Sequence, residues 1–278
     1  MDIANRLGIA AGLDKNGDFI DPLGALGFGF IEVGTITPIA QKGNPKPRVF
    51  RIFNENAIIN RLGFNNKGVD HLVKKLKKRK FNGIVGVNIG ANKESSGQDR
   101  INDYLTCFRK VHEFCDYITV NISSPNTPNL RDLHQSDNLT DLLNAIEGEV
   151  IKVNYAKPIF LKISPDESRE SLESIIQAVD ESSFSGLIAT NTTINKDNLE
   201  NPRYKKLTGG LSGKPLMSKS TKTIIDIKNI SLNMDIIGVG GVMTKEDFHE
   251  KINAGAGLVQ IYTGFIVHGP KIVNELLK

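Results

Sequence analysis

The sequence predicts a closed (β/α)8 barrel, and this prediction depends on two patterns and on the chain length. The first pattern is a series of eight short runs, rich in apolar and β-branched residues, most of them continuous and not alternating. Such runs are typical of strands that are covered on both faces. The second pattern is the set of amphipathic stretches between them, which indicate helices. Eight strands that alternate with helices along 278 residues favour closure, because barrels of this kind take about 250 residues. The alternative is a doubly wound open sheet.

The predicted elements follow a regular order along the chain. The strands are expected at residues 7–11, 29–35, 84–90, 117–123, 158–164, 186–192, 235–241 and 258–263. The helices are expected at residues 70–80, 101–114, 139–153, 168–180, 220–227 and 245–252. Residues 38–66 are expected to form a covering excursion, built as a hairpin, over one end of the barrel, and residues 195–215 a loop. No internal repeat or linker-like segment is visible, so residues 1–278 are predicted to form one domain.

The composition excludes several classes of protein. Hydrophobic residues make up 39% of the chain and charged residues 24%, which are values of globular proteins and not of disordered ones. No apolar run approaches the roughly 18 residues of a membrane helix, and no signal peptide is visible. Cys107 and Cys115 have neither a CxxC nor a zinc spacing, which favours a reducing compartment, no disulfide and burial on a helix.

The net charge of +4 comes from one segment of the chain. Residues 74–80 carry six positive charges, and removing these six from +4 leaves −2 for the rest. The basic excess is therefore not a nucleic-acid-binding face. We interpret the segment as the end of a helix, where cations meet the negative pole of the helix dipole, and keep contact with an anionic membrane as the alternative.

The residues at the carboxyl ends of the predicted strands are the candidate functional residues, because barrels of this type place their active sites there. Nearly all of these residues are Gly, Asn, Ser, Thr or Lys, and Asp14 is the only carboxylate. That composition argues against the paired carboxylates of glycosidases and against an all-oxygen metal site. None of the five histidines falls at a strand end, so we expect neither a histidine acid nor a metal.

The same strand ends suit a heterocyclic, phosphorylated ligand. Asn side chains offer both a donor and an acceptor, which matches a ring with alternating C=O and N–H groups. Lys15 and Lys162 suit an anion, either a carboxylate or the reduced ring of a flavin. The glycine-rich segment 238–242 and the following segment 258–264 lie at the seventh and eighth strands, where barrels often hold a phosphate.

Ten segments of the chain resemble, in order, those of the dihydroorotate dehydrogenase family, the flavin enzymes of pyrimidine synthesis. They are AAGLDKNG (10–17), GTITP (34–38), KPRVFR (46–51), INRLGFNN (59–66), GVNIGANK (86–93), NISSPNTPNLRDL (121–133), ATNTT (189–193), GGLSGKPL (209–216), GVGGV (238–242) and VQIYTG (259–264). One such segment could be chance, but ten in the family's order span nearly the whole chain.

This resemblance implies that FMN lies across the strand ends. It implies that the phosphate is held at Gly213, Gly241, Tyr262 and Thr263. The residues implied to line the flavin are Ala10, Ala11, Gly12, Thr35, Asn88, Asn121, Lys162 and Thr190. No metal is implied.

The resemblance also implies a substrate site for dihydroorotate, stacked on the flavin. The residues implied to hold its carboxylate side are Lys15, Asn60, Arg61, Leu62, Gly63 and Phe64, and those implied to read its ring are Asn121, Asn126, Asn191 and Thr192. By analogy with the family, Ser124 is the base that takes a proton from C5 while a hydride leaves C6 for the flavin, giving orotate. Residues 127–133 are the implied lid. A second interpretation is that Asn121, Ser123 and Ser124 only cap the next helix.

Serine at position 124 is similar to the membrane-associated second class of the family, which passes electrons to a quinone, whereas the soluble class carries cysteine. This similarity implies a peripheral membrane protein, on the cytoplasmic face of a bacterial inner membrane or on the mitochondrial inner membrane, and a monomer. The second class carries an N-terminal helical extension that forms the quinone entry. Because the first predicted strand starts only a few residues after Met1, we expect this chain to lack that extension, so it could be soluble or use another acceptor.

Two other functions remain open at this point. One is a different phosphate-binding barrel enzyme without redox chemistry, which would be colourless. The other is a catalytically dead barrel kept as a binding module, in which Ser124→Ala would change nothing.

Overall fold

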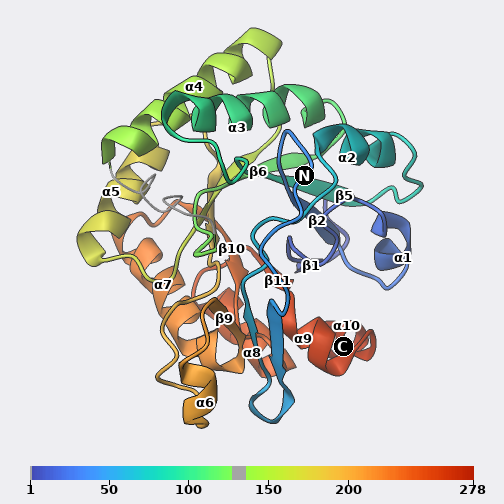
Figure 1. Ribbon diagram of the computed structural model, residues 1–278, viewed down its shortest axis with the longest axis vertical. Coiled ribbons are helices and arrows are strands. Elements are labelled where there is room, and N and C mark those ends of the chain that lie inside the picture. Colours follow the sequence, from blue (N-terminus) through green and yellow to red (C-terminus); the bar gives the residue numbers. More distant parts are fainter. Residues whose placement is uncertain (1, 127–135) are drawn as a thin grey trace.

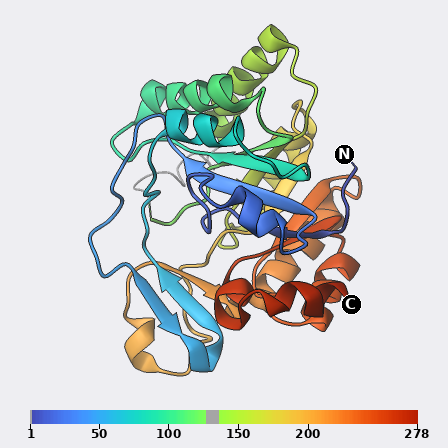
Figure 2. The same ribbon diagram turned by 90° about the vertical axis from the view of Figure 1, so that its right-hand side faces the viewer.

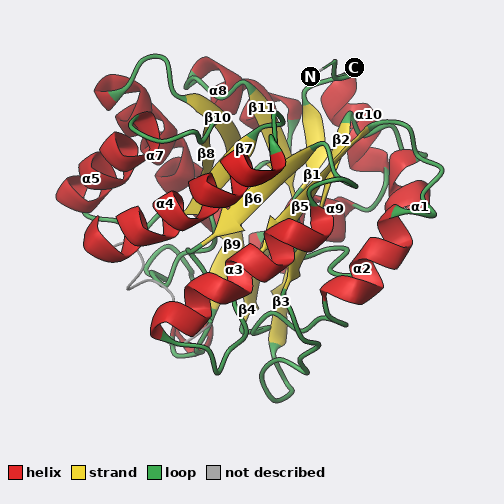
Figure 3. Ribbon diagram, turned by 90° about the horizontal axis from the view of Figure 1, so that it is seen from above, coloured by secondary structure: helices red, strands yellow, loops and turns green. Residues whose placement is uncertain are grey.

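The computed structural model describes residues 2–126 and 136–278 and contains a closed barrel of eight parallel strands. The strand order around the barrel is β1-β11-β10-β8-β7-β6-β5-β2, and Figure 3 shows these strands at the centre with helices around them. The barrel strands are β1 (Leu7–Ile9), β2 (Phe30–Ile36), β5 (Ile84–Ile89), β6 (Tyr117–Asn121), β7 (Ile159–Ile163), β8 (Gly186–Ala189), β10 (Asp235–Val239) and β11 (Leu258–Ile261). All eight predicted strands are confirmed, and closure rules out the open sheet.

Most of the helices cover the outside of the barrel, whereas the short α6 lies beside the antiparallel sheet (Figure 1). They are α1 (Ile20–Gly24), α2 (Val69–Leu76), α3 (Gly97–Val111), α4 (Ser136–Val153), α5 (Arg169–Asp180), α6 (Pro202–Lys205), α7 (Met217–Ile230), α8 (Lys245–Asn253), α9 (Thr263–His268) and α10 (Lys271–Leu277). The six predicted helices are confirmed within a few residues at each end. The helix α2 ends at Leu76, so the basic segment 74–80 runs through its last turn and past its end. None of the helices in the described ranges is long and apolar enough to cross a membrane.

A three-stranded antiparallel sheet lies beside the barrel. The predicted hairpin is confirmed as β3 (Val49–Ile52) and β4 (Ala57–Asn60), with the short 3-10 helix η1 (Phe53–Glu55) between them. In Figure 2 these two blue strands project from the barrel next to the orange helix α6. The third strand, β9 (Gly210–Gly213), pairs with β4 and is followed by the 3-10 helix η3 (Lys214–Leu216).

The prediction of a loop over residues 195–215 was therefore wrong, because the segment contains both α6 and β9. The strand β9 has the sequence GLSG, with one large apolar side chain. Four residues of that kind show no alternation, and their partner strand lies about 150 positions earlier in the chain, at Ala57–Asn60. The strand forms because Leu211 packs with Ile52, Ile59 and Leu199 in a small buried cluster.

Two larger clusters form the core on the two sides of the barrel wall. Residues such as Ile31 and Val33 of β2 belong to the cluster that packs against the helices. Alternate residues of the same strand point the other way, into the barrel. There Phe30 packs with Tyr117 and Phe160 and closes the lower part of the barrel. These side chains fill the barrel interior at that level, and the cavity described below lies at the carboxyl ends of the strands.

Candidate active site at the carboxyl ends of the strands

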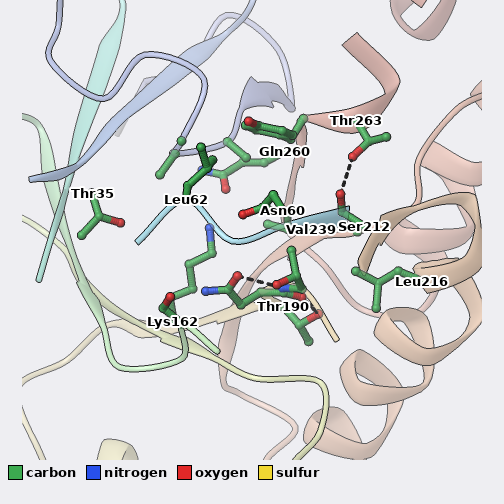
Figure 4. A pocket seen from close by; sticks show the side chains of 18 of the residues that line it. Thr35, Asn60, Leu62, Lys162, Thr190, Ser212, Leu216, Val239, Gln260 and Thr263 are labelled. Atoms are coloured by element: carbon green, nitrogen blue, oxygen red, sulfur yellow. Dashed lines mark hydrogen bonds between the residues drawn. The ribbon is translucent and has the colours of Figure 1, made fainter. Parts of the chain in front are cut away.

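A cavity of about 940 Å³, counting the part open to solvent, lies at the carboxyl ends of the barrel strands. Residues of the hairpin and of β9 form its opposite wall (Figure 4). Predicted site residues that line it are Ala10, Ala11, Gly12, Lys15, Thr35, Asn60, Leu62, Gly63, Phe64, Asn121, Ser124, Asn126, Lys162, Thr190, Asn191, Thr192, Gly213, Gly241, Tyr262 and Thr263. Segments separated by more than 200 positions thus meet at one place.

Two predicted site residues do not line the cavity. The guanidinium of Arg61 turns outward, where it donates to the Pro47 carbonyl at 2.9 Å and to Thr208 Oγ1 at 2.7 Å. Asn88 is fully buried beneath the cavity floor and accepts hydrogen bonds from Thr35 and Asn121. Asn88 therefore supports two cavity residues, and Arg61 fixes the base of the hairpin.

Ser124 lies just past the end of β6 and is 5% exposed. Its Oγ accepts a hydrogen bond from the backbone N–H of Asn126 at 3.2 Å. The next described helix, α4, begins at Ser136, so Ser124 does not cap α4. Among described cavity residues the titratable ones are Lys15, Lys162 and Tyr262, so no carboxylate or histidine adjoins the serine there. The predicted lid at residues 127–133 lies outside the described residues.

The asparagines around Ser124 form a connected network. The Asn121 amide nitrogen donates to Thr35 Oγ1 at 3.0 Å and to Asn88 Oδ1 at 3.1 Å. Ser123 Oγ donates to Asn121 Oδ1 at 3.0 Å and accepts from the Asn191 amide at 3.0 Å. These bonds connect residues on or just after four strands, β2, β5, β6 and β8, and they hold the side chains of Asn121 and Asn191 in place before any ligand binds.

Lys15 stands at the cavity side of the loop after β1. Its pKa is lowered to about 8, chiefly by burial and also by the nearby Arg48, while Asp14 opposes the shift. Its Nζ donates to the Gly12 carbonyl at 2.5 Å. Asp14 is not a cavity residue, because its carboxylate accepts from the backbone N–H groups of Asp18 and Phe19 and caps that loop. Asp14, the only carboxylate among the predicted strand-end residues, thus has a structural role.

Lys162, on β7, projects its amine into the cavity (Figure 4). Burial lowers its pKa, and the carboxylate of Glu32, 4.0 Å away, opposes that shift. Gln260, on β11, was not predicted as a site residue, yet it lines the cavity. A polar residue between Val259 and Ile261 in a buried strand was the signal for it in the sequence.

The far end of the cavity is made of backbone and small side chains. Gly213 ends β9 and Gly241 follows β10, and both have positive φ, 99° and 86°. A Cβ at Gly241 would lie 2.4 Å from the Met217 Cα, so the chain can pass the start of α7 there only as glycine. Thr263, at the start of α9, donates to Ser212 Oγ at 2.8 Å, a bond drawn in Figure 4.

Several other cavity residues were not predicted as site residues. They are Ser212, Leu216, Val239, Gly240, Val242, Ile261 and Gly264. Most are immediate neighbours of predicted positions, so the signal that could have found them is adjacency to the glycine-rich ends. Ser212 and Leu216 could be predicted as cavity residues only with knowledge of the strand β9, which places them over the barrel.

Known proteins of one family match this chain over nearly its whole length. The family model described as dihydroorotate dehydrogenase matches residues 1–278. The protein of Saccharophagus degradans named dihydroorotate dehydrogenase (quinone) is 49% identical over 280 residues, which cover 99% of this chain and 83% of that protein. The protein of the same name from Legionella pneumophila strain Corby is 47% identical, covering 98% of this chain and 84% of that protein. The crystal structure of the Eimeria tenella enzyme, solved with ferulenol, superimposes with a TM-score of 0.92 at 37% identity, covering 98% of this chain and 79% of that one.

Proposed function

This chain belongs to the dihydroorotate dehydrogenase family, and on that premise we propose how its cavity residues divide the work of the reaction. The chain is an oxidoreductase that converts dihydroorotate to orotate in pyrimidine biosynthesis, with a flavin as cofactor. The observation that carries the proposed assignment is the convergence of the strand ends, the hairpin and β9 on one cavity without a carboxylate or histidine among its described residues.

We propose FMN as the flavin. The cavity offers an anion two sites of close backbone approach, at Gly213 and Gly241, next to the start of α9 at Thr263. It offers a flavin ring a buried acceptor, because no donor among the described residues reaches Oε1 of Gln260. These features fit a phosphate at one end and a heterocycle with an N–H group at the other. When bound, the flavin supplies the hydride acceptor.

The side chains proposed to hold the flavin act from the barrel floor. Thr35, Asn121 and Thr190 border the ring position, while Asn88 supports the first two from below. Lys162 brings a positive charge, which favours the reduced form of the cofactor. Gly213, Gly241, Tyr262 and Thr263 are proposed to hold the phosphate.

The substrate is proposed to lie between the floor and the hairpin. Lys15 and the segment 60–64, apart from the side chain of Arg61, face it from one side. The Asn126 amide donates to Asn60 Oδ1 at 3.4 Å, which links the two walls. Asn121, Asn191 and Thr192 face it from the other strands. The outward turn of Arg61 leaves the binding of an anion at this wall to Lys15 and to neutral donors.

Ser124 is proposed as the base that takes the C5 proton at its Oγ. A serine is a weak base at its free pKa and needs its environment to stabilise the deprotonated oxygen. The two cavity lysines, Lys15 and Lys162, are proposed to supply the positive field that stabilises this oxygen. The same charges stabilise the carboxylate of the substrate.

We propose a quinone as the final electron acceptor, because the two relatives described above carry that word in their names and because residue 124 is serine. A lipid-soluble acceptor also leads us to propose peripheral membrane contact. We further propose that the chain is a monomer.

The visible spectrum of the purified protein tests the cofactor and the substrate together. We expect a yellow protein whose flavin absorption bleaches when dihydroorotate is added without oxygen. A colourless protein that cannot be reconstituted with FMN would favour a phosphate-binding barrel without redox chemistry. A yellow protein that dihydroorotate does not bleach would favour a catalytically dead barrel.

A further inference from the structure

Glu32 is a buried carboxylate inside the barrel with no role in the proposed reaction. It lies on β2 and is fully buried. Its Oε1 accepts from the Asn88 amide at 2.8 Å. Its Oε2 accepts from Tyr117 OH at 3.0 Å, from Thr119 Oγ1 at 3.2 Å and from Gln260 Nε2 at 2.8 Å. Four donors from three other strands, β5, β6 and β11, thus hold one carboxylate in a fixed position.

Two of the groups near Glu32 extend to the proposed flavin position. Lys162 Nζ lies 4.0 Å from Glu32 Oε1, and the two side chains are 6% and 0% exposed. A buried ammonium is costly unless an opposite charge lies near it. Burial lowers the pKa of Lys162, and the only charge that raises it is Glu32. The carboxylate therefore favours the charged form of the cavity lysine.

Glu32 also determines which way the Gln260 amide faces. An ionised carboxylate only accepts hydrogen bonds, so Nε2 and not Oε1 must face it. Nε2 makes a second bond, to Tyr117 OH at 3.2 Å. This leaves Oε1 buried and, within the described part of the chain, without a donor, on a residue that lines the cavity.

We propose that Glu32 is a positioning residue for the flavin site: from inside the barrel it keeps Lys162 charged and turns the Gln260 oxygen toward the cofactor. The inference rests on the proposed function. Glu32 itself touches neither the cofactor nor the substrate and acts through these two side chains.

The proposal makes a prediction about the sign of a change in reduction potential. A reduced flavin carries more negative charge than the oxidised one, so the Lys162 ammonium stabilises it and raises the potential. If Glu32 keeps Lys162 charged, then Glu32→Gln leaves a neutral amine and lowers the potential. If Lys162 stays charged without Glu32, removal of a buried negative charge raises the potential instead.

The test is the two-electron reduction potential of the bound flavin, measured by equilibration with a reference dye. We expect Glu32→Gln to shift the equilibrium at least tenfold toward the oxidised flavin, which is about 30 mV for a two-electron couple. We expect Lys162→Met to shift it the same way, and the double variant to shift it no further than Lys162→Met alone. Tyr117→Phe is the matched control: it removes one donor from the same carboxylate and no charge, and should stay within about threefold.

A raised or unchanged potential in Glu32→Gln would overturn the proposal, and so would additive shifts in the double variant. If Glu32→Gln does not fold, the reduction potential of Glu32→Asp is measured instead. The shorter side chain keeps the negative charge but places it farther from Lys162. An intermediate lowering is expected there, and an unchanged potential would contradict the proposal. A colourless wild-type protein would remove both this inference and the proposed function, whereas a wrong sign in a yellow, bleachable protein removes this inference alone.

Discussion

At the scale of single residues, Ser124 illustrates how far a motif defines a role. The serine lies where the sequence predicted, at a strand end in the cavity, and its hydroxyl also accepts a local backbone hydrogen bond from Asn126. That bond is the kind of turn contact that serine makes in many loops. The position of Ser124 is therefore compatible with a base and with a turn residue, and kinetic measurements are needed to distinguish these two roles.

We predict that Ser124→Ala retains the flavin but slows its reduction by dihydroorotate about 10²- to 10⁴-fold at neutral pH, the usual contribution of a general base. Stopped-flow measurement of flavin bleaching gives the rate. Ser123→Ala is the control, because Ser123 is also buried and contacts Asn121 and Asn191 without being the proposed base. It should weaken binding of orotate more than it slows reduction. Near-normal bleaching in Ser124→Ala would refute the assignment of the base.

The lowered pKa of Lys15 predicts a pH dependence of anion binding. With a pKa of about 8 in the ligand-free protein, Lys15 is charged below pH 8 and loses its charge above it. The orotate Kd should therefore be level below that pH and rise about tenfold per pH unit above it. Titration of the flavin spectrum with orotate at each pH measures this. Lys15→Arg should abolish the rise, since a guanidinium stays charged; a Kd that rises equally in both proteins would show that another group titrates.

At the scale of secondary structure elements, the eight barrel strands were predictable because most of them are near-continuous apolar runs. The elements that were missed are short or depend on distant partners. The helix α1 has five residues and α9 has six, too few for an amphipathic pattern to repeat. The strand β9 depends on pairing with β4, which no local pattern reports.

The packing of α7 on the loop after β10 gives a prediction for the phosphate end of the cavity. Gly241→Ala would place a methyl group against the Met217 backbone, so we expect loss of bound FMN, measured by flavin content after gel filtration and by the Kd of FMN for the apoprotein. Gly269→Ala is the matched control, because Gly269 also has positive φ, 70°, but a Cβ there meets nothing within 4 Å. It should retain FMN at a cost of about 1–3 kcal/mol in stability, because its φ of 70° and ψ of −167° suit glycine almost alone. Full FMN content in Gly241→Ala would contradict this arrangement.

At the scale of the whole molecule, the basic segment shows how tertiary context changes the meaning of charge. Lys74 and Lys75 lie in the last turn of α2, and Lys77 Nζ, just past its end, lies 4.5 Å from the ring centroid of Phe114. Arg79 pairs with Asp116 at 3.2 Å. These contacts agree with the interpretation of the segment as a helix end.

We propose that barrel and hairpin form one domain, since both contribute to one cavity.

The choice of electron acceptor is a prediction about the whole enzyme. We expect dihydroorotate oxidation to be faster with a ubiquinone analogue than with fumarate or NAD⁺ by about tenfold or more. Steady-state orotate formation with each acceptor at equal concentration measures this, and dihydroorotate-dependent flavin bleaching without acceptor is the control for an intact first half-reaction. Turnover confined to fumarate or NAD⁺ would overturn the proposed acceptor.

The sequence by itself determined the barrel and most of the candidate site. Apolar runs of strand length can be read locally, and a parallel barrel brings every strand end to the same rim, so residues such as Lys15, Ser124 and Lys162 could be grouped without coordinates. The direction of a side chain depends on contacts across the chain. Only the tertiary structure shows that the Arg61 side chain points away from the cavity and that Asn88 lies beneath the cavity floor. Only the tertiary structure shows that Glu32 lies beside Lys162, 130 positions later in the chain. The reason is that closure of the barrel determines which inward-facing side chains meet, and no local sequence pattern reports it.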